Sequence, residues 1–80
     1  MPDHLVTLLG KPGCHLCDDA RALVVRVATD LGVAWEERDV TTEDALYEEY
    51  ADRIPVVLVD GKEHGYWTVD EGRLRRALAR

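Results

Sequence analysis

The stretch HLVTLLGKPGCHLCDDA, residues 4–20, places an apolar run, a turn and two cysteines in direct succession. Residues 4–9 are typical of a buried strand, and the Gly-Lys-Pro-Gly that follows is typical of a tight loop. Cys14 and Cys17 come next, and they are the only cysteines in the chain. The sequence must therefore explain why this pair stands directly after a strand.

Composition and charge narrow the classes of protein. The chain has 80 residues, of which 46% are hydrophobic and 32% are charged, which predicts one globular domain over residues 1–80. A formal net charge of −6 argues against nucleic acid or an anionic membrane as a partner. Neither a membrane-spanning apolar run nor a secretory signal pattern is present in the sequence. We therefore expect a cytoplasmic protein, and a monomer.

Residues 15–31 have the periodicity of a helix. Their apolar side chains recur at steps of three and four, and Gly32 follows as a C-terminal stop. The positions predicted to face the core are Leu16, Ala20, Leu23, Val27 and Leu31. Residues 32–40 then return to extended character, which predicts a second strand.

The middle of the chain predicts a further helix and a buried strand. The helix is expected over residues 41–53, where Thr41 and Asp44 have capping-box spacing. The run IPVVLVD, residues 54–60, is apolar almost throughout, as in a strand that is covered on both faces.

The last third predicts a hairpin and a final helix. Asp60-Gly61 favours a tight turn, so residues 62–68 should run back antiparallel, and Asp70 is a good N-cap for the helix that follows. The predicted fold is α/β, ordered β-α-β-α-β-β-α, with three helices and a four-stranded mixed sheet. Each of the two helical crossovers is expected to make a pair of parallel neighbours.

Two interpretations of the cysteine pair explain little. A disulfide staple that closes so short a loop is worth only about 2 kcal/mol, and it would face reduction in the cytosol. A metal site is the second interpretation, with His15 or His64 as additional ligands. Structural zinc requires four ligands, however, and the chain has no second C-x-x-C and no H-x-x-x-H.

A redox couple explains more residues together. At the start of a helix, unpaired N–H groups and the macrodipole stabilise a thiolate on Cys14, while Cys17 lies one turn further on, within reach of a mixed disulfide. Lys11 adds positive charge and is expected to lower the pKa of Cys14. His15 has two open interpretations, a residue that tunes this pKa or a solvated residue of the first turn.

The motif KPGCHLC after a strand, together with RIPVVLVDG further along the chain, resembles the glutaredoxin branch of the thioredoxin fold. The resemblance implies that Cys14 attacks a disulfide and that Cys17 resolves the product. It also implies a cis peptide between Ile54 and Pro55 that faces the pair and aligns a bound thiol peptide. Lys11 would then meet the glycine carboxylate of glutathione.

The chain departs from the glutaredoxin pattern at two places. His15-Leu16 stands where glutaredoxins have Pro-Tyr, and Gly65-Tyr66 stands where they have a Gly-Gly pair that receives the γ-glutamyl end of glutathione. Asp70 also comes later than the pattern places its aspartate. We therefore expect thiol–disulfide chemistry with glutathione as a weak co-substrate.

The predicted function is that of a small glutaredoxin-like thiol–disulfide oxidoreductase with no metal and no tightly bound cofactor. Its expected partners are protein or low-molecular-weight disulfides, with glutathione or a thioredoxin-type reductase as the reductant. The alternatives are a non-catalytic thioredoxin-fold binding module and a cysteine-based metal or iron–sulfur carrier. The residues predicted to bind substrate are Lys11, Ile54, Pro55, Gly65, Tyr66 and Asp70.

Overall fold

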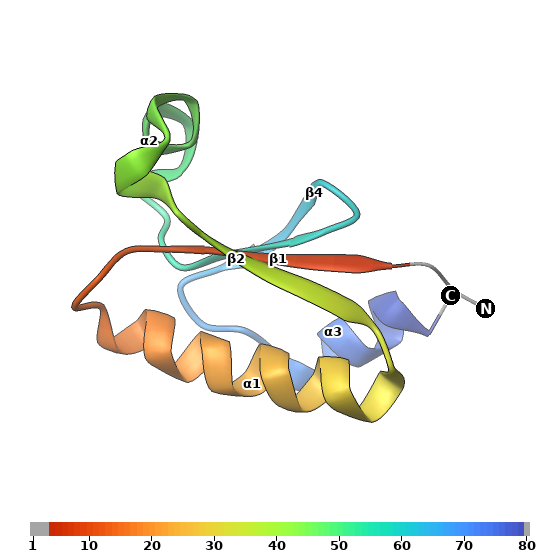
Figure 1. The fold of residues 1–80 in the computed structure, drawn as a ribbon. Helices are drawn as coiled ribbons and strands as arrows, with labels where there is room; N and C mark the ends of the chain where they lie inside the picture. The colour runs from red at the N-terminus through yellow and green to blue at the C-terminus, as the bar shows by residue number, and fades with distance from the viewer. Residues whose placement is uncertain (1–3, 80) are drawn as a thin grey trace.

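The computed structural model describes residues 4–79 and contains a four-stranded sheet with helices on both of its faces. Helices α1 and α3 cover one face, while the shorter α2 lies on the other side at one end (Figure 1). No helix within residues 4–79 is long and apolar enough to cross a membrane. The order of elements confirms the predicted fold class. It is β1 (Leu5–Gly10), α1 (His15–Leu31), β2 (Ala34–Asp39), η1 (Val40–Thr42, a 3₁₀ turn), α2 (Asp44–Tyr50), β3 (Val56–Val59), β4 (Lys62–Tyr66) and α3 (Glu71–Leu78).

The strand order is β2-β1-β3-β4, and this corrects one expectation. Strands β1 and β2 are parallel, but β3 lies beside β1 rather than β2 and runs antiparallel to it, as β4 does to β3. The second crossover is too short to return along the sheet. Helix α2 has 7 residues, so it is only about 10 Å long. The 6 residues of β2 span about 20 Å. Consequently β3 begins at the end of the sheet where β2 stops.

Helix α1 has the predicted bounds and ends at Gly32, whose φ of 66° is left-handed. Its buried stripe, however, is rotated from the predicted one. Leu16 and Leu31 are 44% and 41% exposed, so the expectation that they face the core was wrong. The buried residues of α1 are Cys17, Ala20, Val24, Val27 and Ala28.

The predicted start of the second helix was also wrong. Asp39, rather than a capping box from Thr41 to Asp44, organises this turn. Its Oδ1 accepts hydrogen bonds from the backbone N–H of Thr41 at 2.8 Å and from the Thr41 hydroxyl at 2.6 Å. These bonds favour the 3₁₀ turn η1, and α2 begins only after it, with no side-chain cap.

Strand β3 is buried on both faces, as predicted, because the two sides of the sheet have separate cores. Val57 contributes to the larger core beneath α1 and α3, and Val56 to the smaller core on the side of α2; both are 0% exposed. The hairpin after β3 is confirmed too. Asp60 and Gly61 have φ values of 53° and 83°, as a type I′ turn requires.

Candidate active site

Cys14 and Cys17 meet at the N-terminus of α1. Cys14 is the N-cap residue, and its Sγ accepts a hydrogen bond from the backbone N–H of Cys17 at 3.1 Å. The two Cα atoms are 5.1 Å apart, within the usual range for a disulfide, and the sulfur atoms are near disulfide distance. The pair can therefore alternate between two thiols and a disulfide without moving the backbone far.

The two sulfurs have different surroundings. Cys14 is partly exposed, whereas Cys17 is 0% exposed. The N–H donated to Cys14 and the positive end of the helix dipole both favour negative charge on its sulfur. A substrate can thus reach Cys14 directly, and it can reach Cys17 only through Cys14.

Gly10, at the end of β1, provides the space for Cys17. A Cβ atom at this position would lie 3.2 Å from the Sγ of Cys17 and 3.5 Å from its Cβ. The φ of Gly10 is not left-handed, so the position requires glycine for space rather than for conformation. Sequence analysis assigned Gly10 only to the turn and missed this contact.

A polar hollow of about 400 Å³ opens beside Gly10, on the side of β2. Arg21 binds both oxygens of Glu37, with Nε to Oε1 at 2.7 Å and Nη2 to Oε2 at 2.6 Å, and its Nη1 donates to Asp18 at 2.8 Å. Glu37, and then Asp18, raise the pKa of Arg21 above its ordinary value. Lys11 also lines this hollow and is exposed, which places its charge at the rim of the site.

The opposite side of the site is built from the start of β3 and the end of β4. The Ile54–Pro55 peptide bond is cis, as the resemblance implied. The carbonyl oxygen of Pro55 accepts a hydrogen bond from the backbone N–H of Trp67 at 2.8 Å. Since Leu9 pairs with Val56 across the sheet, this segment lies at the same end of the sheet as Gly10.

The remaining residues predicted to bind substrate differ in their exposure and in their contacts. Tyr66 is 42% exposed, and its ring contacts the Trp67 ring edge-to-face with centroids 4.9 Å apart. Gly65 lies within β4, opposite Val57. Asp70 has a structural task as the N-cap of α3, because its Oδ1 accepts from the Arg73 N–H at 3.0 Å.

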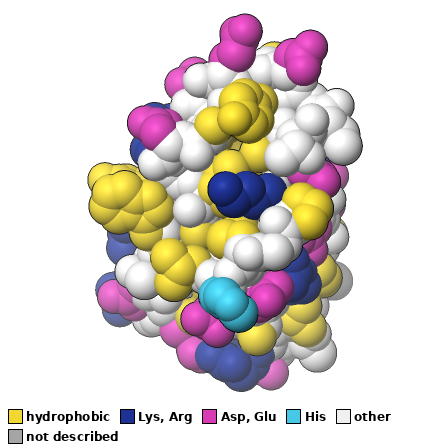
Figure 2. Space-filling view, turned by 90° about the vertical axis from the view of Figure 1, so that its left-hand side faces the viewer, with side chains coloured by type: hydrophobic (Ala, Val, Ile, Leu, Met, Phe, Trp, Pro, Cys, Tyr) yellow, Lys and Arg dark blue, Asp and Glu magenta, His cyan; other side chains and the backbone are white. Residues whose placement is uncertain are grey.

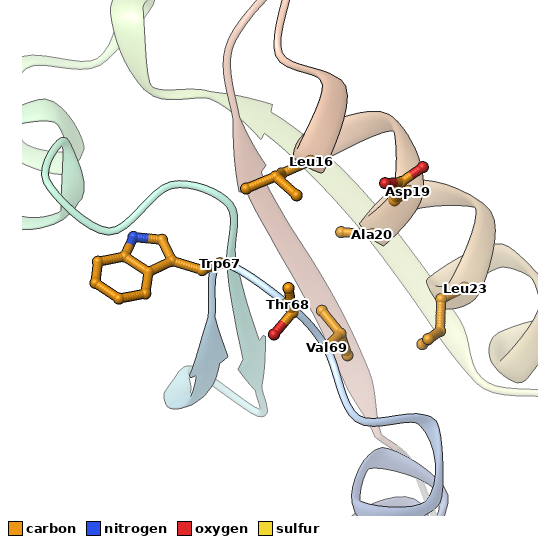
Figure 3. Close-up of a pocket in the computed structure, with 7 residues that line it drawn as sticks. All are labelled: Leu16, Asp19, Ala20, Leu23, Trp67, Thr68 and Val69. Carbon is orange, nitrogen blue, oxygen red and sulfur yellow. The ribbon is translucent and has the colours of Figure 1, made fainter.

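An apolar hollow of about 140 Å³ lies between α1 and the segment that joins β4 to α3 (Figure 3). Leu16, from between the two cysteines, lines it together with Trp67 and Val69. The face of the molecule that carries the β1–α1 turn and α2 shows separate hydrophobic side chains around a basic one, with acidic side chains mainly toward its edges (Figure 2). Sequence analysis did not predict this hollow, because the apolar periodicity of α1 indicated that Leu16 faces the core.

The histidines do not complete a metal site with the cysteines. Within residues 4–79, no three His, Cys, Asp or Glu side chains are arranged to hold a metal ion. His15 is exposed directly after Cys14, and His64 lies half-buried on β4. The Nε2 atom of His64 is buried without a hydrogen-bond partner among the described residues, and burial, with a smaller contribution from Arg73, lowers the pKa of this histidine.

Residues 5–79 match the glutaredoxin-like domain family (DUF836). The chain belongs to this family. An uncharacterised protein of Mycobacterium tuberculosis is 41% identical to it, over 94% of this chain and 82% of the relative. The same values hold for an uncharacterised protein of Mycobacterium bovis.

Solved structures place this glutaredoxin-like domain in the thioredoxin fold. A Nitrosomonas europaea protein superposes with a TM-score of 0.84 at 22% identity, covering 98% of this chain and 94% of the other. A protein from X. campestris has a TM-score of 0.75 at 31% identity, covering 92% and 95%. Fasciola hepatica thioredoxin has a TM-score of 0.72 at 21% identity, covering 99% and 81%. This glutaredoxin-like domain therefore combines a thioredoxin fold with a C-x-x-C pair at the start of its first helix.

Proposed function

We propose that the protein is a thiol–disulfide oxidoreductase that cycles between the dithiol and disulfide forms of Cys14 and Cys17. The observation that carries the proposal is the asymmetry of the pair. The sulfur at the helix N-cap is reachable and accepts an N–H hydrogen bond, while its neighbour is fully buried behind it. This arrangement suits a nucleophile followed by a resolving thiol.

The reaction has two displacement steps. The Cys14 thiolate attacks one sulfur of a substrate disulfide, which forms a mixed disulfide and releases the first substrate thiolate. Cys17 then loses its proton and attacks the Cys14 sulfur, which releases the second substrate thiol and leaves the Cys14–Cys17 disulfide. Two electrons have passed to the substrate. Glutathione or a thioredoxin-type reductase must then supply two electrons to the Cys14–Cys17 disulfide to regenerate the dithiol.

Residues around the pair would align the substrate. The backbone at Ile54 and Pro55, at the head of β3, is suited to pairing with an extended segment beside the reacting cysteine. Lys11 would attract a carboxylate at the rim. Glutathione is a weaker co-substrate in this proposal, because the Tyr66 ring projects where a glycine would admit the γ-glutamyl end, and Asp70 already caps α3.

Low-molecular-weight and protein disulfides are the proposed substrates, and the proposed compartment is the reducing cytosol. In the cytosol the dithiol is the resting form, and each reaction with an oxidised partner converts one dithiol to the Cys14–Cys17 disulfide. Neither a metal ion nor a bound organic cofactor is required by these steps.

Trapping of partners tests the proposal. Cys17→Ser should accumulate mixed disulfides on Cys14, visible as dithiothreitol-sensitive bands on non-reducing gels, because nothing resolves them. Cys14→Ser is the matched control and should trap far less, since Cys17 is buried. Equal trapping by the two variants would contradict the assigned roles. Absence of trapping by both, with iron or zinc bound to the wild-type protein, would favour a metal or cluster carrier.

A further inference from the structure

The apolar hollow beside the cysteines has no task in the chemistry of the pair. It measures about 140 Å³. Leu16 lines it near the start of α1, where the cysteines lie, and Leu23 and Val69 line it farther along the helix (Figure 3). Among the described residues that line it, Asp19 is the ionisable one, and the others are apolar except for Thr68.

The rim of this hollow is unusually apolar for an exposed surface. Leu16 is 44% exposed and Trp67 is 53% exposed, and both are among the most exposed large hydrophobic side chains in residues 4–79. Apolar area that stays exposed next to a reactive group is typical of a binding surface. Leu16 stands between Cys14 and Cys17, so this surface begins two residues from Cys14, the proposed reacting cysteine.

The backbone of Trp67, which lines the hollow, has an unusual conformation. Its φ is 63°, a left-handed value that a bulky residue rarely adopts. The hydrogen bond from its N–H to Pro55 and the edge-to-face contact with Tyr66 fix it there. The indole points away from the other side chains that line the hollow (Figure 3). Backbone strain of this kind clusters at active sites and ligand-binding segments.

We propose that the hollow is a subsite for one large apolar side chain, such as leucine or phenylalanine, next to the reacting cysteine of a protein or peptide disulfide. The inference rests on the proposed function of Cys14 and names the substrate class of that site. The size is suitable, since an apolar protein cavity of about 150 Å³ accommodates benzene. The γ-glutamyl end of glutathione is less suitable, because its carboxylate would meet no cationic side chain among the described residues that line the hollow.

Single-turnover kinetics with defined peptides test the subsite. The probes are peptides whose cysteine is a mixed disulfide with thionitrobenzoate, identical except that the residue beside the cysteine is Leu, Phe, Ala or Asp. In the Cys17→Ser background, the Cys14 thiolate forms a disulfide with the peptide and releases coloured thionitrobenzoate. The Leu and Phe peptides should react at least about tenfold faster than the Ala and Asp peptides at subsaturating concentration.

Two leucines of α1 provide matched variants. Leu16→Ala should bring the ratio of the Leu-peptide rate to the Ala-peptide rate close to one, and the ratio cancels any change in the reactivity of Cys14. Leu31→Ala alters an equally exposed leucine at the far end of the helix and should preserve the ratio. Trp67→Ala should lower the ratio of the Leu-peptide rate to the Ala-peptide rate, as Leu16→Ala does.

The outcomes separate failure of the subsite from failure of the function. The symmetrical disulfide of thionitrobenzoate, which has no peptide, reports the reactivity of Cys14 alone. If it still reacts while all four peptides react at equal rates, the subsite is overturned and the oxidoreductase proposal stands. A preference that survives both Leu16→Ala and Trp67→Ala would also overturn it. A Cys14 that reacts with no disulfide would overturn both proposals.

Discussion

Gly10→Ala tests how tightly the site holds Cys17, the proposed resolving cysteine. The new Cβ would lie 3.2 Å from the Cys17 Sγ, a few tenths of an ångström inside ordinary contact. Cys17 is fully buried in the first turn of α1, and its N–H is bound to Cys14, so the sulfur has little room to move. Overpacking of this kind costs about 1–3 kcal/mol. Alanine also restricts the unfolded chain more than glycine does, which offsets about 0.4–1 kcal/mol of this cost.

The net expectation is a loss of about 0.5–2 kcal/mol in the free energy of unfolding. For a domain of this size each kcal/mol corresponds to about 4–8 °C in Tm, so thermal unfolding should detect it. The resolving step should also slow, because the sulfur that must attack Cys14 is displaced. Acid quenching and mass spectrometry during turnover should therefore show more mixed disulfide on Cys14 than in the wild type.

The same substitution in α3 provides the control. At Gly72 the nearest atom to a new Cβ is Nη1 of Arg76, the flexible end of a side chain, at 3.4 Å. Gly72→Ala should stabilise the protein by about 0.5–1 kcal/mol, since alanine is the better helix former. The reasoning about Gly10 fails if Gly10→Ala raises Tm as much as Gly72→Ala and resolves mixed disulfides at the wild-type rate.

Two further predictions concern glutathione and pH. Tyr66→Gly should raise the turnover of glutathione mixed disulfides by removing the exposed ring that occupies the glycine position; turnover at or below the wild-type level would contradict this. The pKa of folded His64 is lowered, first by burial and then by Arg73, so the unfolded chain takes up the proton more readily as pH falls. Stability should therefore decrease between about pH 7 and pH 5, and urea unfolding of His64→Gln should show a shallower decrease. Equal slopes of unfolding free energy against pH for the wild type and His64→Gln would refute the assignment of this pH dependence to His64.

The local features of the chain were the easiest to predict from sequence. Helix α1 begins and ends where its periodicity and Gly32 indicated, and Asp70 caps α3 as expected. The Asp60-Gly61 hairpin also formed. Each of these depends on contacts between residues close in the chain, so the residue types alone carry the information.

Features that depend on distant contacts were predicted less well. The direction of β3 follows from the length of a crossover, and Asp39 displaced the expected capping box because a competing turn was available beside it. The apolar spacing of α1 could not distinguish a leucine that faces the core from Leu16, which faces the hollow opposite Trp67. Periodicity says that one face is apolar, but not what covers it.

The same division separates chemistry from recognition in this site. The reactive sulfurs, the N–H that supports Cys14 and the glycine that admits Cys17 all come from β1 and the first turn of α1. In contrast, the residues that we propose for recognition come largely from the end of β4 and the segment after it, where Tyr66 and Trp67 are exposed. That segment is joined to the reactive half through the hydrogen bond to Pro55 and through the sheet. Side chains there can change without crowding Cys17, so under the proposed function we expect substitutions in this segment to alter the choice of disulfide and not the chemistry of the pair.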